Sequence, residues 1–138
     1  MKAIPFDPGK DLAPIPFEPG HVELAKELKR LGLPWTPHVG CFVWDGDGTI
    51  EAGSPFPDRI YFILSLPRFL SIFGTIEAMR EKLVWLPTWH QARLLCRRFA
   101  IEDRELADIW ASGRTVSLGD EILVIYQKLA EALRHPRS

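Results

Sequence analysis

The sequence predicts an α+β fold in which a small, mainly antiparallel sheet of three or four strands packs against N- and C-terminal helices. Apolar residues recur at helical spacing towards both ends, and short apolar runs rich in β-branched and aromatic residues occupy the middle. A Gly- and Asp-rich segment separates two of these runs, as in a hairpin. With 138 residues, 46% of them hydrophobic, the chain has the length of one domain and enough apolar material for a core.

The first twenty residues are interpreted as a proline-rich extended arm, and residues 21–138 as a single α+β domain. Five of the chain's 12 prolines lie in residues 1–20, which also hold a near duplication at 4–9 and 15–20. Because proline fixes φ and lacks a backbone donor, the arm should be extended or polyproline-like. Its apolar side chains can then be ordered only by packing on their own domain or on a partner, and we expect at least Phe17 to be buried.

Apolar spacing and breaker residues together place the helices. The expected helices span residues 22–31, 69–73, 76–83, 89–99, 102–111 and 117–133. Gly32 and Pro34 stop the first of these, and Gly74 divides the second from the third. Thr88 is expected to cap the fourth, because its hydroxyl can accept a hydrogen bond from the free N–H groups of the first turn.

The sheet is expected in the middle of the chain. A hairpin is predicted over 41–52, with 41–45 and 49–52 as its two arms, because Asp-Gly supplies the positive φ angles that tight turns require. A further strand is predicted over 59–65, and Val84–Leu86 is a candidate for a short fourth strand.

The D-G-D-G-T run at 45–49 has a second interpretation, because it follows an apolar strand. In this respect it resembles the first motif of the haloacid dehalogenase-like phosphatases. The resemblance implies Asp45 as nucleophile and Asp47 as general acid and base, with Mg²⁺ screening the phosphate charge. Ser65 and Asp120 would then complete the catalytic set.

The spacing after this motif argues against the phosphatase. Consecutive parallel strands need a crossover of roughly a dozen residues or more, usually helical. Residues 50–59, which separate the motif from the next apolar run, contain two prolines and a glycine and leave no room for a helix. The turn is therefore favoured, and a magnesium-dependent phosphatase is retained as an alternative.

Residues 91–111 give a second alternative, because their apolar spacing matches a helix-turn-helix. Arg93, Arg97, Arg98 and Arg104 would be its nucleic-acid-binding residues. The would-be recognition helix, however, carries four acidic residues against Arg104 alone, which would repel phosphates. The formal net charge of −1 also gives no overall attraction for nucleic acid, so this partner is disfavoured.

The stretch from Leu86 to Ala92 reads L-P-T-x-x-Q-A and is followed by an amphipathic helix, a linker and a terminal helix. This arrangement resembles small uncharacterised proteins encoded in bacteriophage and prophage genomes. The resemblance covers about a third of the chain and implies a phage origin. It implies no activity, because those proteins have no established chemistry.

The favoured function is a non-catalytic accessory protein or protein-interaction module, and an enzyme is disfavoured. Large aromatic side chains are enriched where proteins contact one another. The candidate partner contacts are accordingly Phe6, Phe17, Trp35, Trp85 and Trp89. A homodimer is favoured slightly over a monomer, because the arm could be ordered by a second copy.

The remaining expectations concern metals, cofactors and location. No metal or cofactor is predicted, except Mg²⁺ in the phosphatase alternative. Cys41 and Cys96 form no C-x-x-C pair, and neither a signal peptide nor an apolar run of membrane-spanning length is evident. We therefore expect a cytoplasmic protein with reduced thiols that is not inserted in a membrane.

Overall fold

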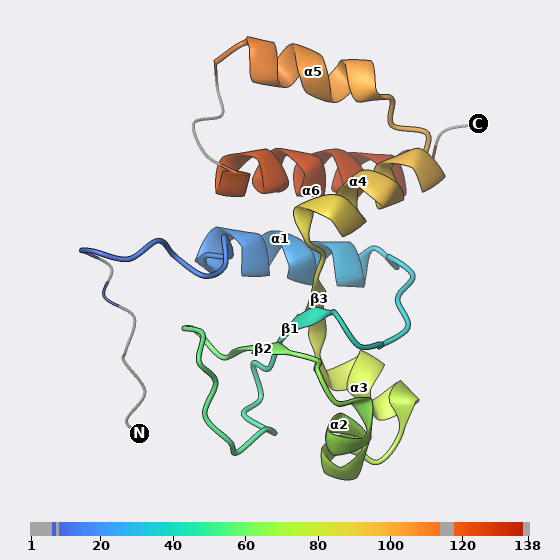
Figure 1. Ribbon diagram of the computed structural model, residues 1–138. Helices are drawn as coiled ribbons and strands as arrows, with labels where there is room; N and C mark the ends of the chain where they lie inside the picture. The colour runs from blue at the N-terminus through green and yellow to red at the C-terminus, as the bar shows by residue number, and fades with distance from the viewer. Residues whose placement is uncertain (1–6, 8, 114–117, 137–138) are drawn as a thin grey trace.

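A three-stranded antiparallel sheet lies at the centre of the molecule, between two groups of helices (Figure 1). The computed structural model describes the chain except for residues 1–6, 8, 114–117 and 137–138. The strands are β1 (Phe42–Trp44), β2 (Ile60–Phe62) and β3 (Val84–Leu86), in the order β2-β1-β3. The predicted α+β fold with a small antiparallel sheet is therefore confirmed.

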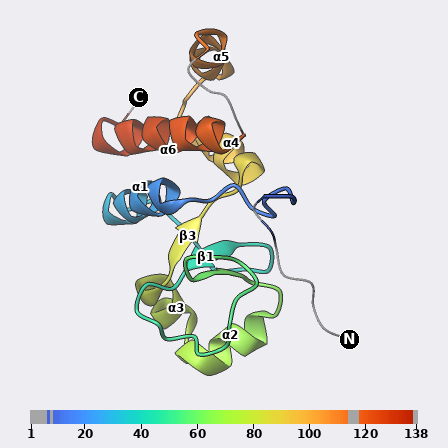
Figure 2. The same cartoon turned by 90° about the vertical axis from the view of Figure 1, so that its left-hand side faces the viewer.

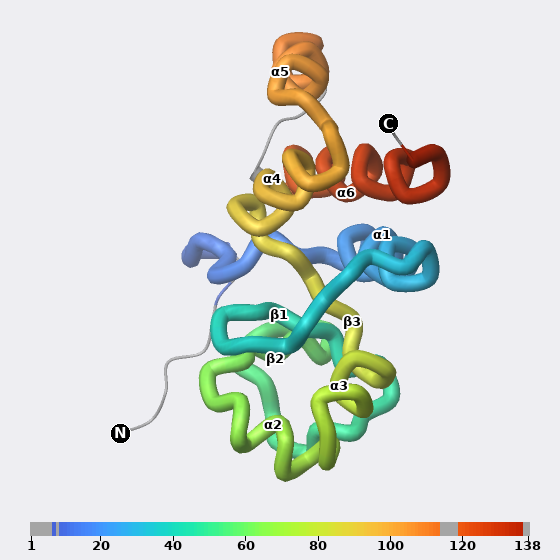
Figure 3. Tube along the Cα trace, turned by 90° about the vertical axis from the view of Figure 1, so that its right-hand side faces the viewer, coloured from blue at the N-terminus to red at the C-terminus, as the bar shows by residue number. Residues whose placement is uncertain are grey.

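Helices cover both faces of this sheet, as Figures 1 and 2 show from two directions. On one side lie α1 (Pro19–Arg30), α4 (Trp89–Arg98), α5 (Asp103–Ala111) and α6 (Leu118–Arg134). On the other side lie α2 (Leu66–Phe73) and α3 (Ile76–Lys82). Of these helices, α5 is the farthest from the sheet and lies beyond α6 and α4 (Figure 3).

The two helical layers produce two hydrophobic cores that share the sheet. The buried side chains of the larger core include Val22, Leu28, Ile60, Leu86, Ile125 and Leu129. Those of the smaller core include Cys41, Val43, Ile50, Ile63, Met79 and Leu83. Successive side chains of a strand point to opposite faces, so Phe42 and Trp44 of β1 pack on the larger core and Val43 on the smaller.

The predicted hairpin over 41–52 is correct in its first arm and wrong in its second. β1 pairs with β2, in the register Val43 opposite Tyr61, and residues 49–52 form no strand. The reason is that the Asp45 carboxylate accepts the backbone N–H groups of Thr49 (3.2 Å) and Ile50 (2.8 Å). Those donors are thereby unavailable to a neighbouring strand, and the turn is a longer connection over residues 45–59.

The helices occupy the predicted positions to within a few residues. The largest shifts, of three residues each, are at α2, which begins at Leu66 rather than at residue 69, and at α1, which begins at Pro19 rather than at residue 22 and so starts within the predicted arm. Proline at the first helical position needs no N–H partner there. The Glu18 N–H at the N-cap is satisfied by His21 Nδ1 at 3.0 Å, which fixes this early start. Thr88 caps α4 as expected, accepting from the Gln91 N–H at 3.1 Å.

The second hexapeptide of the arm, residues 15–20, is anchored to the larger core. Ile15 and Phe17 are buried, and the Phe17 ring contacts the rings of Phe42 (5.5 Å between centroids) and His21 (5.9 Å). Nε2 of the buried His21 lies 2.8 Å from the Gly119 carbonyl oxygen and donates to it, because Nδ1 accepts from Glu18. The burial predicted for Phe17 is thus confirmed, whereas Phe6 lies outside the described residues.

We expect Phe17→Ala to lower the free energy of unfolding by about 3–5 kcal/mol, because it leaves a cavity in the larger core. Leu12→Ala is the matched control in the same arm, since Leu12 is 94% exposed, and should change stability by less than about 0.5 kcal/mol. Urea denaturation monitored by circular dichroism measures the free energy of unfolding of both variants. Equal effects would contradict the anchoring of residues 15–20.

An ion-pair cluster joins α1 to the C-terminal end of α6. The Glu27 carboxylate accepts from Arg30 Nε at 2.8 Å and lies 3.0 Å from a guanidinium nitrogen of Arg134. These hydrogen bonds, first to Arg30 and then to Arg134, lower the pKa of Glu27 from 4.5 to about 2. The folded protein therefore holds this carboxylate in its charged form more strongly than the unfolded chain does.

This shift predicts an acid-dependent loss of stability. A carboxylate with a lowered pKa in the folded state stabilises fully above its unfolded pKa, and the contribution disappears as the pH falls through the folded pKa. The contribution of Glu27 should thus decline between about pH 4.5 and pH 2. Thermal unfolding of Glu27→Gln should show a smaller fall in Tm across that window than the unsubstituted protein. An unchanged pH profile would contradict the ion-pair cluster.

Candidate functional site

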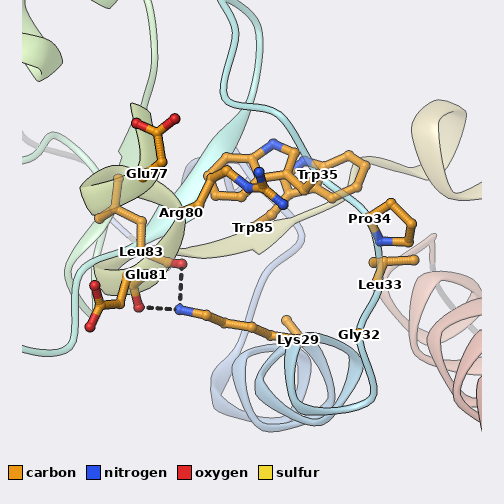
Figure 4. Close-up of a pocket in the computed structure, with 11 residues that line it drawn as sticks. Lys29, Gly32, Leu33, Pro34, Trp35, Glu77, Arg80, Glu81, Leu83 and Trp85 are labelled. Atoms are coloured by element: carbon orange, nitrogen blue, oxygen red, sulfur yellow. Dashed lines mark hydrogen bonds between the residues drawn. The ribbon is translucent and has the colours of Figure 1, made fainter. Parts of the chain in front are cut away.

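A groove with a cavity volume of about 590 Å³ opens near the C-terminal end of α1. Its walls come from α1, α3, β3 and the loop that follows α1 (Figure 4). We call it the indole groove and define it by the lining residues Lys29, Leu33, Pro34, Trp35, Arg80 and Trp85. Two of the predicted partner contacts, Trp35 and Trp85, therefore meet in one concave site.

The local structure explains how two distant tryptophans come together. Gly32 has φ +90°, a left-handed conformation that ends α1 and turns the chain into the 33–35 loop. Trp85 is the middle residue of β3, so its side chain points away from its buried neighbours in the strand, which face the larger core. The Trp35 and Trp85 rings stack with centroids 6.0 Å apart and planes 9° apart. The Trp35 indole also donates to Cys41 Sγ at 3.5 Å.

Lys29 holds one wall of the indole groove in place. Its ammonium donates to the Glu81 carbonyl and, at 3.1 Å, to the Leu83 carbonyl, at the end of α3 (Figure 4). Cations favour the C-terminal ends of helices, where carbonyl groups have no partners within the helix. Burial is the main reason why the pKa of Lys29 lies below its ordinary value, although Asp47 and Glu81 oppose the shift. Lys29 is therefore a structural tie between α1 and α3.

Arg80 is the cation of the indole groove that remains available. It is exposed on α3 and, within the part of the chain that the structure describes, forms no ion pair or hydrogen bond. In Figure 4 its side chain extends towards Trp35 and Trp85, whereas Glu77 and Glu81 of the same helix stand at the rim. The indole groove thus combines flat apolar walls with charges of both signs.

The phosphatase alternative requires Asp45 to face a substrate, but this side chain is fully buried. Its carboxylate oxygens accept two backbone N–H groups, as described above, and one lies 3.2 Å from a guanidinium nitrogen of Arg59. The two neighbours of β1 are both antiparallel to it. The geometry therefore gives Asp45 a structural role, which is to hold the 45–59 connection onto the end of β1.

The other residues of that catalytic set lie apart. Asp47 is exposed in the 45–59 connection, and Ser65 stands at the N-cap position of α2. Asp120 is in the first turn of α6, on the opposite side of the sheet from α2 (Figure 1). Within the described residues, no three His, Cys, Asp or Glu side chains group closely enough to hold a metal ion.

The helix pair α4 and α5 has the connection that a helix-turn-helix would need, but Arg93 faces inwards between the two helices. Its guanidinium lies over the rings of Trp89 (5.2 Å) and Trp110 (5.3 Å) and donates to Asp103 at 2.7 Å. The Nε1 atoms of both tryptophans and Nε of Arg93 are buried without an acceptor. Trp89, a predicted partner contact, therefore belongs to this cluster and not to the indole groove.

The three remaining arginines of the nucleic-acid set are more accessible. Arg97 lies 3.9 Å from Asp103, which also binds Arg93, so one carboxylate engages two of the four arginines. Arg98 and Arg104 are exposed. A surface with half of its cations already paired offers weak attraction for phosphates.

The sequence pointed to Trp35 and Trp85 but not to the other groove residues. In the sequence, Lys29 and Arg80 appear only as basic residues near the ends of two helices, and Pro34 appears only as a helix stop. Nothing in their local pattern signals that α1 and α3 converge. A contact between two helices on opposite sides of a strand depends on the tertiary fold, which the sequence pattern does not encode.

The two aspartates of the D-G-D-G-T run should differ in their effect on stability. We expect Asp45→Asn to lower the free energy of unfolding by about 1–3 kcal/mol, because an amide nitrogen cannot accept the buried N–H groups that the carboxylate accepts. Asp47→Asn, on an exposed side chain, should change it by less than about 0.5 kcal/mol. Chemical denaturation compares the two. Equal effects would show that Asp45 does not hold the connection.

Comparison with known proteins adds no functional assignment. No protein-family model, curated protein or solved structure matches this chain. The resemblances to phage-encoded proteins and to the phosphatase motif stay predictions. Among the described helices, none has both the length and the apolar character that crossing a membrane demands. The functional argument therefore rests on the geometry of the indole groove.

Proposed function

We propose that this protein is a non-catalytic interaction module, and that the indole groove binds an extended, proline-containing segment of a partner protein. The observation that carries the proposal is the stack of Trp35 and Trp85 beside the unpaired Arg80. Proline-rich segments dock into grooves lined by aromatic rings, because a preformed polyproline helix loses little entropy on binding. The flat indole surfaces and Pro34 offer such a lining.

The chemistry of the lining favours binding over catalysis. The residues that line the groove include no serine, cysteine or histidine, and the Lys29 ammonium is occupied by two carbonyl groups. What remains is apolar surface flanked by Arg80, Glu77 and Glu81. Arg80 can pair with an acidic residue of the bound segment, while the two glutamates disfavour further negative charge. The preferred ligand is therefore an apolar, proline-containing segment with a single acidic residue.

Peptide titration tests the proposal. Synthetic nonapeptides with proline at every third position, an aromatic residue at the centre and either one Asp or one Lys beside it are added to the full chain. We expect quenching or a shift of tryptophan fluorescence, with the Asp peptide binding more tightly. Because aromatic anchors dominate such interfaces, Trp35→Leu should weaken binding by about tenfold or more. Arg80→Glu should reverse the preference between the two peptides.

Trp110→Leu is the matched control, since Trp110 lies on α5 outside the indole groove. It should leave the affinity unchanged. If none of the peptides binds, or if Trp35→Leu binds them as tightly as the unsubstituted protein, the indole groove is not the interaction site.

A further inference from the structure

We propose that the occupant of the indole groove is the first hexapeptide of the arm, residues 4–9, supplied by a second copy of this chain. The inference rests on the proposed function and names its ligand. Residues 4–9 read I-P-F-D-P-G, and residues 15–20 read I-P-F-E-P-G. This segment has the composition that the indole groove favours: two prolines, a central aromatic residue and one acidic residue beside it.

The second hexapeptide shows what such a segment does when it meets aromatic rings. Ile15 and Phe17 are buried, and Phe17 packs against Phe42 and His21 within the same molecule. That site is therefore filled. The first hexapeptide has the same apolar pair and requires a different aromatic surface. Among the described residues, the stacked pair of Trp35 and Trp85 provides one in a concave site.

The position of the arm makes the contact intermolecular. The described part of the arm leads into the N-terminal end of α1 (Figure 1). The residues that line the indole groove include Lys29 and Gly32, at the other end of this helix. A helix of 12 residues is about 18 Å long. The docked segment is therefore assigned to a second copy.

The charges of the segment match those of the groove. Asp7 is exposed and follows Phe6 directly, so a docked Phe6 brings this carboxylate towards the unpaired Arg80. A turn begins at Asp7, where the Asp7 carboxylate accepts the Gly9 N–H at 2.9 Å and the Asp11 carboxylate accepts the Asp7 N–H at 2.9 Å. In the sequence Lys2 precedes the segment by two residues, and its charge is opposite to that of the glutamates at the rim.

The contact can be reciprocal. Two copies whose α1 helices run antiparallel bring the arm of each molecule to the indole groove of the other. Each arm then occupies the groove of the other molecule, so no arm or groove is left free. The assembly is therefore closed as a two-fold dimer. The expected product is a dimer rather than a filament.

Complementation between two full-length variants tests the inference. The arm variant is Phe6→Asp, which keeps an intact groove. The groove variant is Trp35→Ala, with Arg80→Glu as a second groove variant because Arg80 is exposed and its replacement leaves the cores untouched. Sedimentation equilibrium measures association of each protein alone and of equimolar mixtures, and far-UV circular dichroism checks folding. Leu12→Asp, on an exposed residue of the same arm, is the matched control.

We expect the unsubstituted protein and Leu12→Asp to dimerise with the same affinity. Each arm or groove variant alone should dimerise at least about tenfold more weakly, which corresponds to about 1.4 kcal/mol. A mixture of the arm and groove variants should recover dimer, because one intact arm meets one intact groove.

Three results would overturn the inference: a monomeric unsubstituted protein, a Phe6→Asp variant that dimerises normally, or a mixture that fails to recover dimer. If the groove still binds the proline-containing nonapeptides in that case, the proposed function stands with another protein as the partner. If the peptides also fail to bind, both the inference and the proposed function are wrong.

Discussion

A strand of three residues that packs against both hydrophobic cores constrains the whole molecule. β1 contributes Phe42 and Trp44 to one core and Val43 to the other, so a shift of its register by one residue would exchange the two sets of side chains. Antiparallel partners on both edges oppose such a shift. Asp45 opposes it as well, because it stands directly after the strand and ties the connection over 45–59 to the strand end through backbone N–H groups and Arg59. The two helical layers depend on this one fixed register.

The elements that depend on local signals could be predicted from the sequence, and those that depend on tertiary contacts could not. Thr88 and Gly74 mark helix boundaries through a cap and a breaker, and both work as expected in the structure. The prediction of a second hairpin arm was wrong because two backbone N–H groups of that segment donate to the Asp45 side chain. An alternation of apolar and polar residues does not reveal such a hydrogen bond. The early start of α1 depends on the reciprocal bonds between Glu18 and His21, which the periodicity of leucines does not reveal.

The candidate site shows the same division. Burial and neighbours separate the aromatic side chains that were predicted as partner contacts. Phe17 belongs to the core, Trp89 to the Arg93 cluster, and Trp35 with Trp85 to the indole groove. The D-G-D-G-T run is a sharper example, because a carboxylate after an apolar strand suits either a nucleophile or a buried acceptor of backbone hydrogen bonds. The full burial of Asp45 and the antiparallel neighbours of β1 favour the second role.

The two hexapeptides bear differently on how the chain associates. Residues 15–20 run directly into α1, so Phe17 cannot leave its site without disturbing the His21 link to α6. In the first hexapeptide, the Asp7 carbonyl accepts the N–H groups of Lys10 and Asp11, so a turn and not a helix begins at Asp7. Burying one phenylalanine yields roughly 1.5–3 kcal/mol, whereas association costs roughly 4 kcal/mol or more. A single arm in a single groove is therefore a weak contact. Once one arm has docked, the second contact of a reciprocal pair becomes intramolecular, and the affinity of the pair then depends on how rigidly each arm is held at the N-terminal end of α1.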